Sequence, residues 1–170
     1  MDVLKLIRER RTARSFTGEP IDPEVLDRIL DAGRMAPSAK NRQAWRFVAV
    51  QKSELKAAMA DASYGDRRVL DAGCVVAICT TNIHYTMPNG QSSYPMDLSF
   101  ATAFMMMQAE SEGLSSALLG TYDERSIKDI LTVPHAMRVA LLLAIGAKGE
   151  EEPTRLERHP MDRVVSFDHW

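Results

Sequence analysis

The sequence predicts an α+β fold, in which helices flank a mixed central β-sheet. Apolar residues recur at helical spacing in several segments, and shorter apolar segments lie between them. The two kinds of segment alternate irregularly along the chain, which favours layers of helices around a sheet. With 170 residues, 45% of them hydrophobic and 26% charged, the chain suffices for one core. We therefore expect a single domain over residues 1–170.

Two helices are predicted near the N-terminus. Asp2 can cap the first one, and Asp22 can cap the second, which has Pro23 at its first helical position. The second helix is expected to end between Gly33 and Pro37. The apolar side chains that share one face are Val3, Leu6 and Ile7 in the first helix, and Val25, Leu26, Ile29 and Leu30 in the second.

The remaining elements follow from short apolar segments and from helix start and stop signals. The expected strands are Arg46–Val50, Val75–Ile78, Ser116–Leu119 and Arg138–Ile145. The expected helices are Ser53–Asp61, Asp97–Glu112 and a helix that Asp123 caps and that ends at Leu131. A polar loop over 82–95 precedes the helix at Asp97–Glu112, whose apolar side chains nearly surround it, so we predict that it is a central core helix.

Charge and hydropathy exclude several classes of protein. The net charge of -2, from 21 basic and 23 acidic residues, gives no overall signature of nucleic-acid binding. Apolar runs are too short to cross a membrane, and the charged N-terminus does not fit a signal peptide. We expect a cytoplasmic protein without nucleic-acid or membrane partners.

Cysteine and histidine give no metal or redox motif. Cys74 and Cys79 are expected in one strand with their side chains on opposite faces, so they cannot form a disulfide and are interpreted as buried apolar residues. The histidines lack metal-ligand spacing, and motifs for nucleotide binding or for hydrolysis are absent. If the protein is an enzyme, a bound organic cofactor is expected to carry the reactivity.

Two polar clusters are candidate binding segments. Arg10–Arg14 holds three arginines and a hydroxyl, which suit a phosphate; equally, its cations can complement the dipole at a helix C-terminus. Ala36–Trp45 is a loop of hydrogen-bonding side chains between a helix and a strand. At the other end of the chain, an arm over about 153–170 carries apolar residues that cannot reach their own core, which indicates an oligomer.

Taken together and in their order along the sequence, these clusters and several other segments make the chain resemble the FMN-dependent nitroreductase family over essentially its whole length. The matching segments are Arg10–Arg14, Ala36–Asn41 with Gln43 and Trp45, Arg68–Ala72, Glu112–Ser116 leading to Leu119 and Gly120, Ile145–Gly146, and Arg158–Val165. The family usually has Ser at the position of Thr12 and Pro at that of Ala44. The resemblance implies an interlocked homodimer that exchanges C-terminal arms and binds one FMN at each of two interface sites.

The resemblance also implies the cofactor ligands. It places Arg10, Arg11 and Thr12 at the phosphate and ribityl end, with Arg158 and Arg155 approaching the phosphate from the C-terminal side. At the ring it places Arg14 and Arg68, the backbone of Leu119 and Gly120 near N5, and Pro37, Ser38, Ala39 and Asn41 from the other subunit. We leave Asp66 out, because a carboxylate that pointed inward would repel a phosphate. No separate catalytic residue and no metal site are expected.

The implied activity is reduction of a nitroaromatic, a quinone or a similar small acceptor with NADH or NADPH, in a two-step hydride transfer through N5 of the flavin. Other flavin reactions on this fold, namely enoate reduction, dehalogenation and dehydrogenation, stay open. So do a flavin-binding protein without turnover and a dimeric scaffold whose arginines only cap helices.

Overall fold

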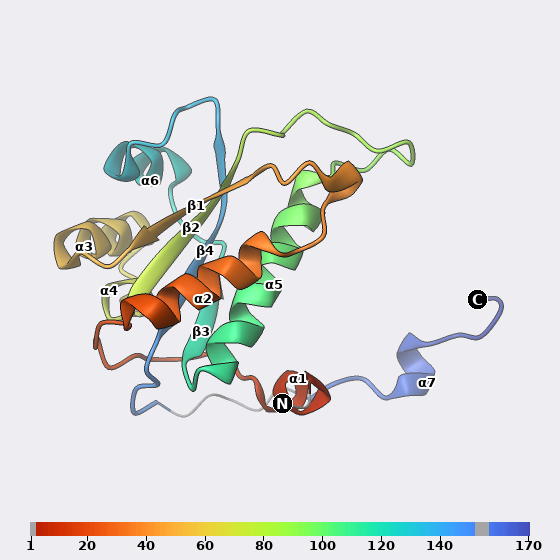
Figure 1. Ribbon diagram of the computed structural model, residues 1–170, viewed down its shortest axis with the longest axis horizontal. Helices are drawn as coiled ribbons and strands as arrows, with labels where there is room; N and C mark the ends of the chain where they lie inside the picture. Colours follow the sequence, from red (N-terminus) through yellow and green to blue (C-terminus); the bar gives the residue numbers. More distant parts are fainter. Residues whose placement is uncertain (1–2, 152–156) are drawn as a thin grey trace.

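The computed structural model describes residues 3–151 and 157–170. At its centre is a four-stranded sheet in the order β1-β2-β4-β3 (Figure 1). The strands are β1 (Trp45–Val50), β2 (Cys74–Thr80), β3 (Ser115–Leu119) and β4 (Arg138–Gly146). Every residue of β2 is buried, because strands pair with both of its edges and helices cover both faces of the sheet. The predicted α+β class is confirmed.

The prediction of a mixed sheet is wrong for these four strands. All three neighbouring pairs are antiparallel, and among the described residues parallel pairing is limited to an isolated bridge between Thr12 and Ser116. Strands β2 and β3 do run in the same direction, as the single long helix between them suggests. However, β4 lies between them and is antiparallel to both, so no parallel pair forms.

Helices cover both faces of the sheet (Figure 1). On one face lie α2 (Pro23–Arg34) and α5 (Tyr94–Ser111); on the other lie α3 (Ser53–Ala62), α4 (Arg67–Leu70) and α6 (Glu124–Leu131). Two separate hydrophobic clusters result, one on each side of the sheet. Ile29 and Met105 belong to the first cluster, and Met59, Val69 and Ile127 belong to the second.

Local capping explains why the predicted helices begin where they do. Asp22 Oδ1 accepts hydrogen bonds from the backbone N–H groups of Glu24 and Val25, at 2.9 and 3.3 Å. Asp123 Oδ2 accepts one from the N–H of Ser126 at 2.8 Å. Helix α5 begins at Tyr94, earlier than predicted, because proline fits the first turn of a helix. Not expected were the short helices α4, η1 (Ala39–Asn41) and α7 (Met161–Val164).

Helix α5 is not the central core helix that its composition suggests. One side packs on α2 and the sheet through Leu98, Ala101 and Met105, whereas Phe100 and Phe104 are 44% and 42% exposed. Elements that pack on one side of a helix can cover only part of its circumference. Because α5 has apolar residues on every side, some of them remain exposed and form an apolar stripe. The stripe lies near the middle of α5.

Both ends of the chain also expose apolar side chains. In α1 (Val3–Glu9) no residue is buried, and Val3, Leu4 and Ile7 are exposed. The segment that contains α7 extends away from the sheet and its helices (Figure 1), and Phe167 and Trp170 are exposed there. No helix in the described part of the chain combines the length and the apolarity needed to span a bilayer.

The two thiols are expected to resist modification in the native protein. Burial raises the pKa of Cys74 to about 12 and that of Cys79 to about 11, and their side chains belong to the two different clusters, as predicted. Both are therefore protonated thiols without solvent access at pH 8. Ellman's reagent should titrate almost no thiol in buffer and both in urea. Rapid reaction in buffer would contradict this burial.

Candidate functional site

The basic segment after α1 crosses the outer edge of β3. The backbone N–H of Ala13 donates to the carbonyl of Ser116 at 2.9 Å, and Thr12 forms the parallel bridge with Ser116. This crossing fixes Arg10 and Thr12 beside the first half of β3. The structure thus brings together segments that lie about a hundred residues apart in the sequence.

At this crossing, two buried polar atoms lack a hydrogen-bond partner. They are Arg10 Nη1 and the Oγ of Ser116, whose residue is 1% exposed; neither has a partner among the described residues. Leaving such donors unsatisfied in a buried place costs free energy, more so for a charged group. An oxyanion would accept from both kinds of donor. Sequence reasoning singled out Arg10 for an anion; it included Ser116 in a segment that matches the family but did not predict it as a ligand.

The neighbouring arginines behave differently. The Nη1 atom of Arg11 donates to the carbonyls of Arg8, Glu9 and Arg10 at 2.5, 3.0 and 2.9 Å. Arg11 therefore satisfies the free carbonyls at the end of α1, which is the helix-capping alternative left open above. Arg14 is exposed.

An acidic side chain lies near the same crossing. Burial raises the pKa of Glu110, in the last turns of α5, against the opposing attraction of Arg10 and Arg11. Desolvation thus disfavours the charged form of the carboxylate that would compete with a bound phosphate for these cations.

The second cluster forms a constrained loop around η1. Lys40, Asn41 and Gln43 have φ angles of 54°, 53° and 48°, in the left-handed region that residues other than glycine rarely adopt. Two hydrogen bonds support the loop: the N–H of Gln43 donates to Ser38 Oγ at 3.0 Å, and the N–H of Ala39 donates to Asp97 Oδ1 at 2.8 Å. Such a conformation persists only where its surroundings enforce it.

Asp97 is the residue that anchors this loop, and sequence reasoning treated it only as a helix start. It lies in the first turn of α5 and is 4% exposed, and its Oδ2 is buried without a partner among the described residues. The carboxylate joins η1 to the beginning of α5, so the loop and the helix form one unit.

The two clusters lie at opposite ends of α5. Asp97 marks the end beside η1, and Glu110, which interacts with Arg10 and Arg11, marks the other. At a rise of 1.5 Å per residue, these positions are roughly 20 Å apart along the helix axis. Figure 1 shows the same separation of η1 from α1. A single chain therefore does not bring its Pro37–Asn41 loop to its own Arg10.

Arg68 is held by a carboxylate. Its Nε and Nη2 donate to the two oxygens of Asp66 at 3.0 and 2.6 Å, in a bidentate pair at the start of α4. The hydrogen bond from Arg68 lowers the pKa of Asp66, and the same contact raises that of Arg68. Asp66 therefore points at Arg68, and the pair presents little net charge to a ligand.

The other predicted ligands are placed as follows. Leu119 ends β3 and is buried, while Gly120 is exposed; apart from its two chain neighbours, no described residue has an atom within 4 Å of the position a Cβ would take there. Gly120 lies about 13 Å along the strand direction from Ser116, which leaves open space at the far end of the same edge. Arg158 lies in the exposed arm, and Arg155 lies outside the described residues.

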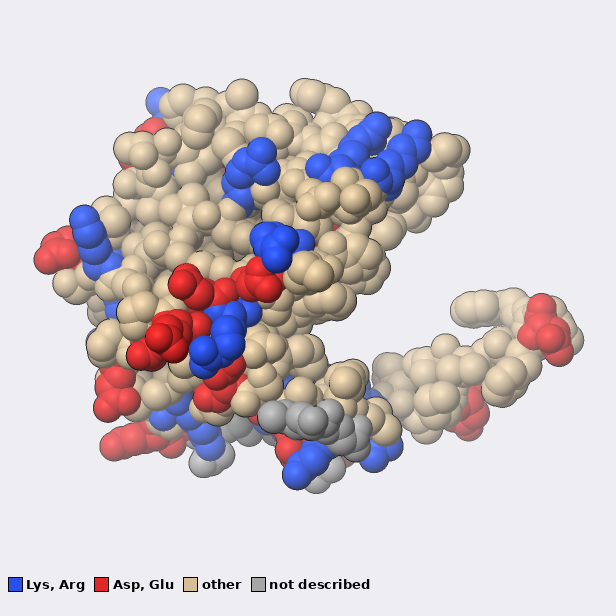
Figure 2. Space-filling model, viewed as in Figure 1, with Lys and Arg blue, Asp and Glu red and all other residues tan. Residues whose placement is uncertain are grey.

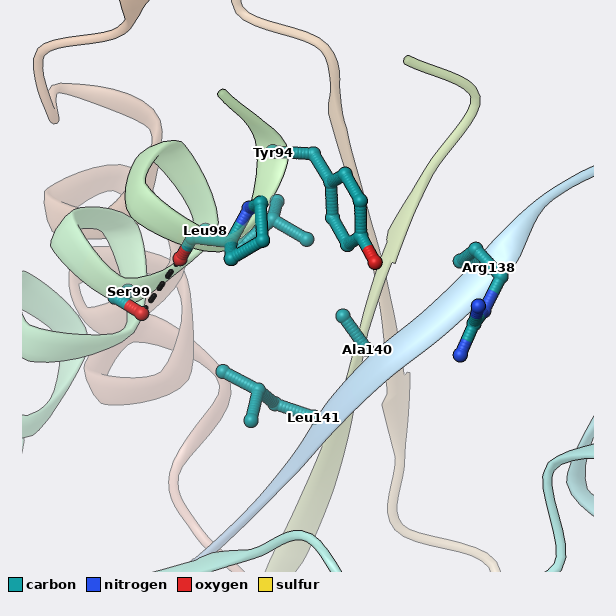
Figure 3. A pocket seen from close by; sticks show the side chains of 7 residues that line it. Tyr94, Leu98, Ser99, Arg138, Ala140 and Leu141 are labelled. Carbon is teal, nitrogen blue, oxygen red and sulfur yellow. Dashed lines mark hydrogen bonds between the residues drawn. The ribbon is translucent and has the colours of Figure 1, made fainter. Parts of the chain in front are cut away.

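A cavity of about 200 Å³ lies between the beginning of α5 and the first half of β4 (Figure 3). Its lining side chains are Tyr94, Pro95, Leu98, Ser99, Arg138, Ala140 and Leu141. Arg138 is already paired with Glu124 at 3.0 Å, and none of the predicted cofactor ligands lines this space. In the described part of the chain, no group of three or more His, Cys, Asp or Glu side chains could hold a metal ion.

Comparison with known proteins matches the sequence of this chain to one family. A sequence profile described as the nitroreductase family matches residues 7–72 and 64–147. A protein of Archaeoglobus fulgidus, provisionally named NADH dehydrogenase/NAD(P)H nitroreductase, is 29% identical over 89% of this chain and 88% of its own.

Solved structures agree in fold. A nitroreductase family protein of Clostridium difficile 630 superposes with a TM-score of 0.87 at 25% identity, covering 100% of both chains. An FMN-dependent nitroreductase of Clostridium difficile R20291 gives a TM-score of 0.84 at 22% identity, covering 98% of this chain and 99% of its own.

Proposed function

The chain belongs to the nitroreductase family, and from this premise we propose that it is an FMN-dependent oxidoreductase. Its electron donor is NADH or NADPH, and its acceptor is a nitroaromatic, a quinone or a similar small molecule. The names of the Archaeoglobus relative and of the FMN-dependent Clostridium structure support this proposal. When bound, FMN supplies the redox chemistry, by accepting two electrons from the reduced nicotinamide and releasing them to the acceptor.

The buried Nη1 of Arg10, which has no hydrogen-bond partner in the described part of the chain, is the observation that carries the proposal. Together with Ser116 Oγ and Thr12, it offers donors to a phosphate at the crossing of the N-terminal segment and β3. Arg11 and, from the arm, Arg158 and Arg155 add positive charge in this proposal. The site fits the phosphate end of FMN, because a dianion would satisfy buried donors to which residues 3–151 and 157–170 offer no acceptor.

The rest of the site serves the ring. Arg14 would supply a cation at the pyrimidine edge of bound FMN, where it would stabilise the reduced, anionic form electrostatically. Arg68 is held in position by Asp66 and acts as an oriented donor rather than a net charge. Leu119 and Gly120 supply backbone groups beside open space at the end of β3.

A homodimer completes the site. The exposed stripe of Phe100 and Phe104 lies near the middle of α5. In the proposed dimer, two copies pair through this stripe about a two-fold axis perpendicular to α5, so that the two α5 helices are antiparallel. The η1 end of one copy then meets the Arg10 end of the other. This arrangement brings Pro37, Ser38, Ala39 and Asn41 of the second copy to the cofactor of the first, and a single chain does not achieve it.

Absorbance spectroscopy tests the proposal directly. The purified protein is expected to be yellow and to lose its flavin absorbance when NADPH or NADH is added without oxygen; an acceptor such as a nitroaromatic or a quinone should then restore it. A colourless protein that does not take up added FMN would contradict the proposal and support the alternative of a scaffold whose arginines only cap helices. A yellow protein that neither donor reduces would be a flavin-binding protein without turnover.

Replacing Arg14 with glutamine should lower the midpoint potential of the bound flavin and slow its reduction. A charge-assisted contact is worth about 1.5–3 kcal/mol, and this one is stronger for the reduced, anionic form than for the oxidised form. The potential is measured against a reference dye, alongside the FMN content. An unchanged potential in a fully loaded variant would show that Arg14 does not face the pyrimidine.

A further inference from the structure

Two cations and an aromatic ring form a rim beside η1. The guanidinium carbon of Arg42 lies 3.7 Å from the centre of the Tyr85 ring, and Lys40 Nζ lies 5.6 Å from the same point. Tyr85 belongs to the loop between β2 and α5, so the rim joins two separate loops. Figure 2 shows Lys and Arg side chains gathered at the end of the molecule where Figure 1 places η1.

This rim carries positive charge without nearby compensation. No Asp or Glu occurs in residues 32–53, which contain η1 and β1, or in residues 81–96, which contain Tyr85. Within the described residues, neither Lys40 nor Arg42 lies in a salt bridge. The nearby Asp97 is buried and already accepts the N–H of Ala39. Both cationic side chains are exposed, so they are available to an anion in solution.

The rim is also held in place before any ligand arrives. The left-handed backbone at Lys40 and the hydrogen bond from Ala39 to Asp97 fix the loop, and the contact with Tyr85 holds the guanidinium of Arg42 over the ring. A guanidinium over an aromatic face keeps N–H groups that can donate to phosphate oxygens. Two such cations on a rigid support lose little conformational entropy on binding.

We propose that Lys40 and Arg42, supported by Tyr85, bind the phosphoryl groups of the nicotinamide dinucleotide donor. The inference rests on the proposed function, in which the η1 loop of one copy covers the flavin site of the other and so lies where the donor must enter. The shared chemistry is a phosphoryl oxygen on the donor. It has two sources: the pyrophosphate that NADH and NADPH share, and the 2′-phosphate that only NADPH carries.

Three donors and one double variant test this proposal on the FMN-loaded protein. The donors are NADPH, NADH and 1-benzyl-1,4-dihydronicotinamide, which has no phosphate. In K40Q/R42Q, kcat/KM for NADPH relative to the phosphate-free donor is expected to fall about tenfold or more. An equal fall for NADH assigns the rim to the pyrophosphate, and a fall for NADPH alone assigns it to the 2′-phosphate. Raised ionic strength should lower the same ratios in the unmodified protein.

A binding measurement gives a readout that does not depend on turnover. Calorimetry with adenosine 2′,5′-bisphosphate and with ADP should show binding to the oxidised, FMN-loaded protein, weakened about tenfold in the double variant for whichever phosphate the rim contacts. K52Q is the control for charge removal, because Lys52 is exposed at the far end of β1, about 20 Å away. It should leave the donor ratios and both affinities unchanged.

The outcomes separate this inference from the function on which it rests. A protein without FMN overturns the proposed function and the inference together. A yellow protein that all three donors reduce, and whose ratios and affinities are the same in K40Q/R42Q, overturns the inference alone. So does a variant in which only reduction of anionic acceptors such as 4-nitrobenzoate is impaired, because the rim would then serve the acceptor.

Discussion

Replacing Arg10 with alanine is expected to weaken FMN binding by about 10- to 100-fold. The physical reason is the buried Nη1 that has no partner among the described residues, which a phosphate would satisfy. A hydrogen bond that involves a charged group contributes about 1.5–3 kcal/mol, which corresponds to this range of dissociation constants. Quenching of flavin fluorescence, titrated into protein stripped of its cofactor, measures the change. Ser116→Ala should show a smaller loss, because it removes a neutral donor.

Riboflavin provides the matched ligand for this prediction, since it lacks only the phosphate. Arg10→Ala and Arg158→Ala should weaken FMN much more than riboflavin, although the two arginines come from opposite ends of the chain. Arg34→Ala is the control variant, because Arg34 is exposed on α2 and paired with Asp31; neither affinity should change. Equal losses of FMN and riboflavin in Arg10→Ala would place Arg10 elsewhere than at the phosphate.

The parts of the fold that could be predicted from sequence depend on local physics. Two helix starts are predicted from contacts within a few residues, at Asp22 with Pro23 and at Asp123 before α6. Both caps are present in the structure. The β2 strand is short, apolar and β-branched, and it is buried on both faces as expected. The helix caps and the apolar pattern of β2 can be predicted because each depends only on residues of its own segment.

Other features are set by contacts between distant segments. The antiparallel sheet follows from the insertion of β4 between β2 and β3, which no local pattern specifies. Ser116 and Asp97 gain their places in the site from the crossing of residues 10–13 over β3 and from the packing of η1 on α5. The composition of α5 predicted burial on all sides but could not show which side stays uncovered. Only the assembled layers determine that Phe100 and Phe104 are left exposed.

Introducing aspartate at both Phe100 and Phe104 is expected to convert the protein to monomers and to release FMN, although every proposed phosphate ligand is kept. In a two-fold dimer, four of these rings are buried, at about 1.5–3 kcal/mol each, or roughly 6–12 kcal/mol before the entropy of association is subtracted. Unpaired carboxylates would add a further penalty. Tyr64→Asp is the control, since Tyr64 is exposed after α3, away from α5. Size-exclusion chromatography with light scattering reports the mass, and absorbance reports the flavin.

Removal of residues 161–170 tests the same assembly without touching α5. It deletes Met161, Val164, Phe167 and Trp170, which are exposed in the described chain, and it keeps Arg155 and Arg158. If these side chains pack on a second copy, each contributes about 1.5–3 kcal/mol, less the entropy lost in ordering the arm. The truncated protein should then shift toward monomer and lose FMN with its phosphate ligands intact. A truncated protein that stays dimeric and yellow would show that the arm is dispensable, and the stripe on α5 would then be sufficient to hold the dimer.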